Sequence, residues 1–205
     1  MRGKGILIAV AIAATAIVSG CSTTGGTAFV NAYGAKNDSG YALPKIPVSK
    51  IDRQFRRQVV SYETKQRPGT IIIDTSAKHL HLVLGDGKAM RYGIGVGREG
   101  FLWKGTAKVG WKREWPTWTP PEPMIRREPD LAKYRGGMKP GLNNPLGARA
   151  LYLMRNGRDT GYRLHGTPEW WSIGGNVSSG CIRLMNQDII DLYERVKPGA
   201  KVIVT

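Results

Sequence analysis

The sequence predicts a mostly β fold for the part of the 205-residue chain that follows residue 67. Beyond Pro68-Gly69 the chain changes to short runs rich in β-branched and aromatic residues, which are typical of strands. Asp86-Gly87 and Asn156-Gly157 lie between such runs, and both dipeptides favour tight hairpins because glycine tolerates a positive φ. One clear helical pattern appears, from Asn186 to Val196.

The expected strands account for the β-rich runs in turn. They are Thr70–Asp74, His79–Leu84, Lys88–Val96, Gly105–Lys112, Arg149–Met154, Gly161–His165 and Lys201–Val204. In the second run, His79, His81 and Val83 alternate with three leucines, which indicates a strand with one buried face. Two histidines at this spacing could supply half of the ligands of a metal site. Because no third ligand is evident, we expect hydrogen-bonded or solvent-facing histidines and no metal.

The single helix and an insertion complete the predicted domain. Asn186 offers an N-cap, and Pro198-Gly199 follows the end of the helix. Residues 122–141 are charged and rich in turn-forming residues, so we interpret them as a flap inserted on the sheet. The preceding stretch, Trp115–Pro121, contains three prolines that prevent regular structure. It is either a platform for a carbohydrate or peptide or a rigid loop over the core.

The first residues have the pattern of a secretory signal. Arg2 and Lys4 precede an apolar stretch over residues 6–18 that is too short for a permanent membrane-spanning helix. Val18-Ser19-Gly20-Cys21 resembles the lipobox of bacterial lipoproteins, in which the cysteine becomes diacylated and N-terminal after cleavage. We expect a signal peptide at residues 1–20 and lipidation at Cys21. The expected location is the periplasmic face of the envelope. The residue after the cysteine is Ser22 and not aspartate, which under the sorting rules for Gram-negative lipoproteins suggests an anchor in the outer membrane. The alternative is an ordinary cleavable signal peptide.

A strong positive charge points to an anionic partner. Lysine and arginine number 31 against 15 aspartate and glutamate residues, which gives a formal net charge of +16. An exported protein has little access to nucleic acid, so we expect no nucleic-acid partner. The remaining candidate partners are anionic lipid and peptidoglycan, whose stem peptides carry carboxylates.

Residues 21–67 are expected to connect the anchor to the folded domain at 68–205. The stretch from Ser22 to Lys45 is rich in small and polar residues without a period, which is typical of a flexible tether. Residues 48–66 carry several basic side chains and could include a short basic helix. That helix would contact polymer or membrane, or would be a solvated face.

Cys181 and His165 are the candidates for chemistry. The chain has only two cysteines, which excludes a disulfide framework, and lipidation of Cys21 would leave Cys181 as the one thiol. Small residues precede Cys181, and main-chain N–H groups at Gly180 and Cys181 could donate to an oxyanion. His165 is expected where a strand ends. The two residues are either a Cys/His catalytic pair or a buried cysteine and an unrelated histidine.

The order of motifs resembles the catalytic domain of the L,D-transpeptidases, also called the YkuD family. The matching motifs are His165-Gly166-Thr167, Ser172-Ile173-Gly174, Ser178 to Leu184, Asn186, Asp188, Leu192-Tyr193 and Val196, with Asn144-Pro145-Leu146-Gly147 and the Trp115–Pro121 stretch upstream. The resemblance spans about residues 70–205. It implies a mostly β fold of mixed sheets in a sandwich.

The resemblance also implies roles for individual residues. Cys181 corresponds to the nucleophile, His165 to the general base and Arg183 to a substrate-binding arginine. Many family members have a second histidine where this chain has Ser179. The role usually given to that position is a main-chain carbonyl that orients the base, and serine preserves a carbonyl.

The implied reaction is acyl transfer on peptidoglycan, and it requires no metal or organic cofactor. Cys181 would attack the carbonyl between the third stem-peptide residue and the terminal D-Ala, and an acceptor would then resolve the thioester. The acceptor is diaminopimelate of another stem (a 3→3 cross-link), an amine of an envelope protein, or water, which gives L,D-carboxypeptidase activity. The competing interpretations are a non-catalytic peptidoglycan-binding lipoprotein and a structural spacer.

Overall fold

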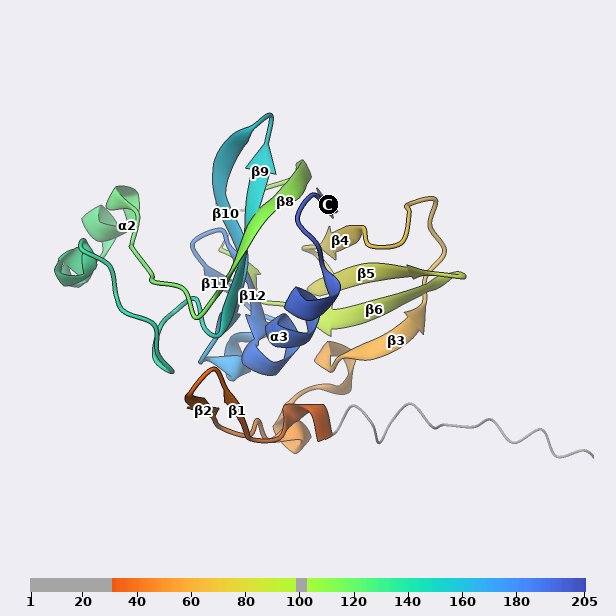
Figure 1. The fold of residues 1–205 in the computed structure, drawn as a ribbon, viewed down its shortest axis with the longest axis horizontal. Coiled ribbons are helices and arrows are strands. Elements are labelled where there is room, and N and C mark those ends of the chain that lie inside the picture. Colours follow the sequence, from red (N-terminus) through yellow and green to blue (C-terminus); the bar gives the residue numbers. More distant parts are fainter. Residues whose placement is uncertain (1–30, 99–102) are drawn as a thin grey trace, which may run out of the picture.

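The computed structural model describes residues 31–98 and 103–205 (Figure 1). The expected signal peptide at residues 1–20 and the expected lipidation site Cys21 lie outside the described residues. Within the described ranges, no helix has the length and apolar character needed to cross a membrane.

The described residues form one large mixed sheet and two small sheets. In spatial order, the strands of the large sheet are β12 (Ile182–Met185), β10 (Arg158–Thr167), β9 (Arg149–Arg155), β8 (Gly105–Glu114), β13 (Lys201–Val204), β4 (Ile71–Asp74), β5 (His79–Gly85), β6 (Lys88–Gly93) and β3 (Gln58–Ser61). The small sheets pair β1 (Lys36–Asp38) with β2 (Tyr41–Leu43) and β7 (Val96–Gly97) with β11 (Asn176–Ser178). In the large sheet β10 pairs with β12 and β13 with β4 in parallel, whereas the other neighbours are antiparallel. The predicted mostly β, mixed-sheet fold is confirmed.

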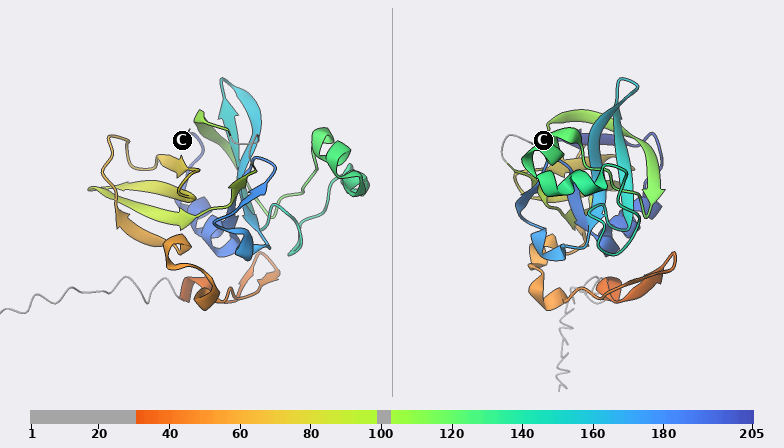
Figure 2. Two further views of the ribbon diagram at one scale, coloured as in Figure 1. Left: turned by 180° about the vertical axis from the view of Figure 1, so that it is seen from behind. Right: turned by 90° about the vertical axis from the view of Figure 1, so that its left-hand side faces the viewer.

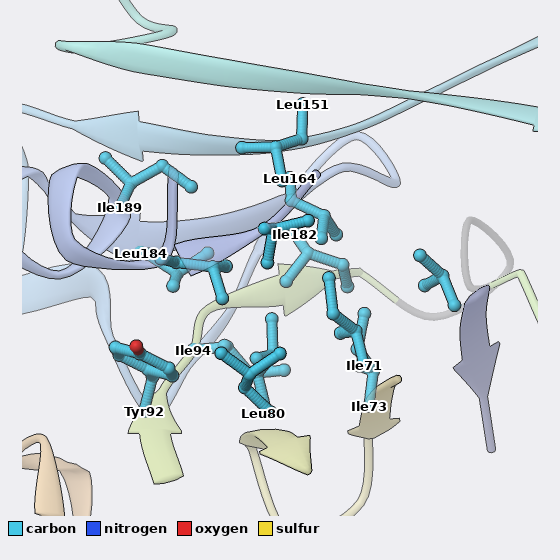
Figure 3. Close-up of a cluster of buried hydrophobic side chains, with 14 of the residues drawn as sticks. Ile71, Ile73, Leu80, Tyr92, Ile94, Leu151, Leu164, Ile182, Leu184 and Ile189 are labelled. Carbon is cyan, nitrogen blue, oxygen red and sulfur yellow. The ribbon is translucent and has the colours of Figure 1, made fainter. Parts of the chain in front are cut away.

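The main core lies between the two halves of this sheet, which face each other as in a sandwich (Figure 3). Strands β9, β10 and β12 supply Leu151, Leu164, Ile182 and Leu184, while β4, β5 and β6 supply Ile71, Ile73, Leu80 and Tyr92. All of these side chains are buried. Their packing fixes β10 and β12, the strands that carry the candidate catalytic residues.

The helices are few and short. They are α2 (Glu122–Arg127), α3 (Asn186–Arg195) and the 3₁₀ turns η1 (Asn31–Tyr33), η2 (Val48–Lys50), η3 (Arg53–Phe55), η4 (Pro129–Tyr134) and η5 (Trp170–Ser172). Helix α3 has the predicted position, and its Ile189 and Leu192 are fully buried. The predicted N-cap role of Asn186 is wrong. Met185 occupies the N-cap position, and Asn186 Oδ1 instead accepts a hydrogen bond from the main-chain N–H of Ala148 at 2.9 Å.

Two predicted strands differ from their sequence pattern. The register between β5 and β6 shifts between Val83 and Gly85, so Val83 is buried and Leu84 is exposed, the reverse of simple alternation. The predicted strand over residues 88–96 is divided, because β6 ends at Gly93 and β7 begins at Val96. Between them Gly95 forms a bridge with Arg183, next to the candidate site.

The predicted flap projects away from the sheet between β8 and β9 (Figures 1 and 2). Its base is fixed by the fully buried side chain of Asn144, whose Nδ2 donates to the carbonyls of Pro116, Met138 and Lys139 at 3.1, 3.2 and 3.1 Å. Trp115 is also buried, and its ring stacks on Tyr41 with the centroids 4.0 Å apart. At Trp115, the stretch is therefore a rigid loop over the core and not an exposed platform.

Residues 31–67 are not the flexible tether and basic helix that their composition predicts. Tyr33 and Leu43 are almost fully buried, and the segment runs beneath α3 in Figure 1. Residues 48–66 form η2, η3 and β3. The apolar residues of this segment are too few and too widely spaced to produce a period. Tyr33, Leu43, Ile46 and Ile51 are nevertheless buried in clusters with residues of the C-terminal half of the chain.

Candidate active site

Two neighbouring parallel strands position the predicted catalytic residues. Leu164 of β10 lies opposite Ile182 of β12, and His165 lies opposite Arg183. Leu164 and Ile182 belong to the main core, so His165 and Arg183 point to the opposite face because side chains alternate along a strand. Cys181 directly precedes β12 and, by the same alternation, shares the face of Arg183. The structure thus brings the predicted nucleophile, base and substrate-binding arginine to one face.

His165 is almost fully buried and makes a short hydrogen bond. Its Nδ1 lies 2.6 Å from the carbonyl oxygen of Gly166. The tautomer with a proton on Nδ1 donates to this carbonyl and leaves Nε2 as the basic nitrogen. Burial lowers the pKa of His165 to about 4, and contacts with the carbonyls of Gly166 and Pro145 only partly oppose this effect. The imidazole is therefore neutral at neutral pH.

The carbonyl that orients His165 differs from the one expected. The resemblance assigns this role to Ser179, but in the described part of the chain no hydrogen bond joins Ser179 to His165, and the ring partner is Gly166. The sequence contained a signal for this, because Gly166 is part of the His-Gly-Thr motif. Ser179 itself is half-buried in the turn before Cys181.

Cys181 is half-buried, and its thiol is protonated at neutral pH. Burial raises its pKa, while the nearby Arg163 and Arg183 act in the opposite direction. The Sγ atom lies 4.0 Å from the carbonyl oxygen of Gly161. No hydrogen bond joins Cys181 to His165 among the described residues. Such bonds are often long before substrate binds.

The turn before Cys181 is held by Ser178, a residue to which sequence reasoning gave no role. Ser178 is buried, and its Oγ donates to the carbonyl of Cys181 at 2.6 Å and accepts from the N–H of Gly180 at 3.2 Å. Gly180 has a φ of +118°, a conformation that favours glycine. In this structure the Gly180 N–H is therefore engaged within the turn and is not free to donate to an oxyanion as expected.

Arg183 is paired with a carboxylate that sequence reasoning also missed. Its Nη1 donates to Glu169 Oε2 at 2.8 Å, and the Glu169 side chain is half exposed. The Nε of Arg183 is buried without a hydrogen-bond partner within the described residues. The guanidinium therefore retains donor capacity for a second anion.

The described residues contain no cluster of three or more histidine, cysteine, aspartate or glutamate side chains suited to a metal ion. The two strand histidines have other contacts. His79 Nε2 lies 3.1 Å from the carbonyl of Gln54, and the ring of His81 stacks on Tyr62 with the centroids 4.3 Å apart.

Comparison with known proteins identifies the family. The model of the L,D-transpeptidase catalytic domain, YkuD, matches residues 68–204. The chain belongs to the L,D-transpeptidase catalytic-domain family. The match includes β10 and β12 and therefore all of the site residues described above. Residues 31–67, which pack beneath α3, lie outside the part matched by this L,D-transpeptidase model.

A relative with a similar sequence supports the family assignment. The Escherichia coli K12 protein named Probable L,D-transpeptidase YbiS is 39% identical over 120 residues, which is 53% of this chain and 35% of that protein. This chain thus matches about a third of the length of that protein.

Two solved structures share the fold. A Brucella melitensis crystal structure described as a probable carnitine operon oxidoreductase has 44% identity and a TM-score of 0.53 over 78% of this chain and 99% of that chain. The description as an oxidoreductase applies to the Brucella protein and is not transferred to this chain. The C442S mutant of Enterococcus faecium L,D-transpeptidase has 18% identity and a TM-score of 0.51 over 68% of this chain and 50% of that chain.

Proposed function

We propose that the chain is a peptidoglycan L,D-transpeptidase in which Cys181 is the nucleophile and His165 is the general base. The observation that carries this proposal is the register of β10 and β12, which orients both side chains to one face within the family-matched region. The neutral state of His165 also supports it, because only a neutral imidazole can accept a proton.

The acylation step starts from two uncharged side chains. As Cys181 Sγ attacks the carbonyl carbon between the third stem residue and the terminal D-Ala, its proton passes to His165. The carbon–nitrogen bond then breaks, and His165 gives the proton to the leaving amine of D-Ala. A thioester on Cys181 remains.

Arg183 is the residue proposed to bind the donor. A guanidinium can donate two parallel hydrogen bonds to one carboxylate, and the Arg183 side chain lies in register with His165. In the absence of donor, Glu169 holds the guanidinium through Nη1. In this proposal the side chain of Ser179 has no role, and the residue contributes only its main chain to the turn before Cys181. The carbonyl of Gly166, and not that of Ser179, orients the imidazole.

The acyl-enzyme is then resolved by an acceptor. An amine acceptor gives either a 3→3 cross-link or an envelope protein attached to the wall, and water gives L,D-carboxypeptidase activity. The test is analysis of muropeptides from purified sacculi incubated with the wild-type protein or with Cys181→Ala. New 3→3 dimers with release of D-Ala, absent with Cys181→Ala, are expected. Binding to sacculi with no change in muropeptides would favour a non-catalytic binding protein instead.

We also propose that the mature protein is exported and anchored through a diacylated Cys21, in the outer membrane. The lipobox-like Val18-Ser19-Gly20-Cys21 and Ser22 support this location. Metabolic labelling with a palmitate analogue, followed by membrane fractionation, tests it. Labelled wild-type protein in the outer-membrane fraction and unlabelled Cys21→Ala protein are expected, whereas wild-type protein in the soluble periplasm would contradict it.

A further inference from the structure

The ion pair between Glu169 and Arg183 lies on the same face of the sheet as the candidate nucleophile and base. Arg183 is opposite His165 on the neighbouring parallel strand and follows Cys181 by two residues. Its positive charge interacts electrostatically with both Cys181 and His165. Glu169 Oε2 accepts a hydrogen bond from Arg183 Nη1 at 2.8 Å. A carboxylate is therefore held next to the guanidinium proposed to bind the donor.

The main chain on each side of this ion pair is fixed by other contacts. The N–H of Glu169 donates to Thr167 Oγ1 at 3.1 Å, and its carbonyl accepts from Ser172 Oγ at 2.7 Å. Arg183 exchanges two main-chain hydrogen bonds with Gly95, at 2.8 and 2.9 Å. A partly exposed ion pair adds little to stability. The side chains of the pair are thus positioned but are not needed to hold the fold, which leaves them available to a ligand.

Each partner of the pair keeps a polar atom that is not used. Among the described residues, neither Glu169 Oε1 nor Arg183 Nη2 has a hydrogen-bond partner. The Glu169 side chain is 50% exposed and that of Arg183 is 20% exposed. Asp159 differs, because both of its oxygens accept from Arg163, at 2.6 and 2.7 Å. The pair therefore offers a ligand one negative and one positive group side by side.

A ligand that complements such a pair carries both charges close together. In a zwitterionic amino-acid head group, an ammonium and a carboxylate share one carbon. The carboxylate can accept from a guanidinium while the ammonium donates to a neighbouring carboxylate, so each charge meets its opposite. Diaminopimelate, the third stem residue named for the proposed reaction, ends its side chain in a head group of this kind.

The spacing along the chain agrees with the length of that side chain. Five bonds separate the reacting carbonyl carbon of the third stem residue from the carbon of its head group, a span of about 6 Å when extended. Two residues of extended chain separate Cys181 from Arg183, which is about 6.6 Å. A donor whose carbonyl lies at Cys181 Sγ can therefore place its head group at the Glu169–Arg183 pair.

We propose that Glu169 determines donor specificity by binding the ammonium group at the end of the third residue's side chain, while Arg183 binds the carboxylate on the same carbon. The pair then selects donors whose third residue ends in a zwitterionic head group. This inference rests on the proposed acyl-transfer function. An ammonium held by Glu169 stays protonated and cannot act as a nucleophile, so the donor's own amine does not attack the thioester.

The test combines four donor tetrapeptides with a matched pair of variants. The tetrapeptides differ only at the third residue, which is diaminopimelate, 2-aminopimelate (no distal amine), lysine (no distal carboxylate) or norleucine (neither). Glu169→Gln removes the proposed anion, and Glu194→Gln removes an exposed carboxylate from α3 as the control. Rapid-quench mass spectrometry measures the second-order rate constant for acylation of Cys181 in the first turnover, before an acceptor intervenes. Circular dichroism checks that each variant is folded.

The preference for an amine on the donor is the quantity that should change. We expect the wild-type protein to favour diaminopimelate over 2-aminopimelate by roughly tenfold, as for one charge-assisted hydrogen bond. In Glu169→Gln this preference should fall to about twofold or less, and the preference for lysine over norleucine should fall with it. Glu194→Gln should keep both preferences of the wild-type protein.

Two results would overturn the proposal while leaving the proposed function intact. One is a wild-type protein that is acylated equally fast by diaminopimelate and 2-aminopimelate donors. The other is an equal fall for these two donors in Glu169→Gln, because a residue that merely holds Arg183 in place would affect every donor with a distal carboxylate alike. If none of the four tetrapeptides acylates the wild-type protein, the proposed function fails and the assignment of Glu169 fails with it.

Discussion

Burial sets the protonation of the two candidate catalytic side chains. It lowers the pKa of His165 to about 4 and raises the pKa of Cys181, so the free protein holds a neutral thiol and a neutral imidazole. A thiolate–imidazolium pair would require the opposite shifts. For the proposed acylation we therefore expect proton transfer to accompany the attack on the substrate and not to precede it.

The rate of acylation should depend on pH in a way that reflects this burial. His165 stays neutral, and so able to accept a proton, down to about pH 4 instead of the ordinary value of 6.5. We expect the acidic limb of the acylation rate to have its midpoint near pH 4, measured by adduct formation from about pH 3 to pH 7. A midpoint near 6.5 would contradict the assignment. Between these values the unfolded chain binds more protons at this residue, so the stability from burying neutral His165 is lost as the pH falls.

The adjacent serines Ser178 and Ser179 should differ sharply in their effect on acylation. Ser178→Ala removes the two hydrogen bonds that hold the turn before Cys181, so we expect acylation to fall by roughly ten- to a hundredfold, which corresponds to about 1.4–2.7 kcal/mol in the activation barrier. Ser179→Ala keeps the main chain and should cost at most about tenfold.

His165→Ala is the reference for these two serines. It should lose more than the roughly 10²–10⁴ typical of a missing general base, because activation of Cys181 is lost as well. A loss in Ser179→Ala as deep as in His165→Ala, with an intact circular dichroism spectrum, would show that the Ser179 hydroxyl has a catalytic role.

The β1–β2 hairpin anchors the N-terminal segment to the catalytic sheet. Asp38 accepts hydrogen bonds from Trp115 Nε1 at 2.8 Å and from both terminal nitrogens of Arg149 at 2.7 and 3.1 Å, and all three side chains are buried. The hairpin therefore stabilises the start of β9 and the beginning of the flap.

Removing the carboxylate of Asp38 should be strongly destabilising. Asp38→Ala leaves the buried guanidinium of Arg149 without its main partner, and breaking such a pair costs about 3–5 kcal/mol. Lys36→Ala, which removes a largely exposed charge from the same hairpin, should change stability by at most about 0.5 kcal/mol. Urea denaturation measures both. Equal effects would show that the hairpin is not anchored through Asp38.

Sequence reasoning found most of the sheet but missed contacts that depend on tertiary packing. The seven predicted strands follow their hydrophobic patterns to within a few residues, but the sequence pattern did not predict β12, the parallel neighbour of β10 that begins directly after Cys181. Asn186 failed as an N-cap because Ala148, distant in sequence, engages its side chain. Glu169 gave no signal of its own, and Ser178 belonged to a matching motif but had no assigned role, since the two roles depend on the approach of Arg183 and on the Gly180 turn.

The whole molecule extends the family domain with a segment that packs onto it. The family model matches residues 68–204, yet Tyr33 Oη donates to Asp188 on α3 at 3.1 Å, and Gln187 Nε2 donates to the carbonyl of Pro44 at 3.0 Å. Gln187 and Asp188 are both buried in the first turn of α3, and α3 directly follows β12. The segment is therefore part of the folded unit.

A chain of residues 68–205 should consequently be less stable than one of residues 31–205. Removal of residues 31–67 exposes apolar side chains such as Met185 and Ile190 and removes the partner of buried Asp188. We expect a lower urea midpoint for the shorter chain, measured by tryptophan fluorescence. An unchanged midpoint would show that residues 31–67 add nothing to the stability of the domain.

The central claim is that Cys181 is the acylated nucleophile. Incubation with a carbapenem, whose strained β-lactam carbonyl is open to attack by a nucleophilic thiol, followed by intact-protein mass spectrometry and peptide mapping, tests it most directly. We expect the wild-type protein to gain the mass of one carbapenem, located on the peptide that contains Cys181, and Cys181→Ala to gain none. An adduct that persists in Cys181→Ala, or a folded wild-type protein that remains unmodified, would contradict the claim.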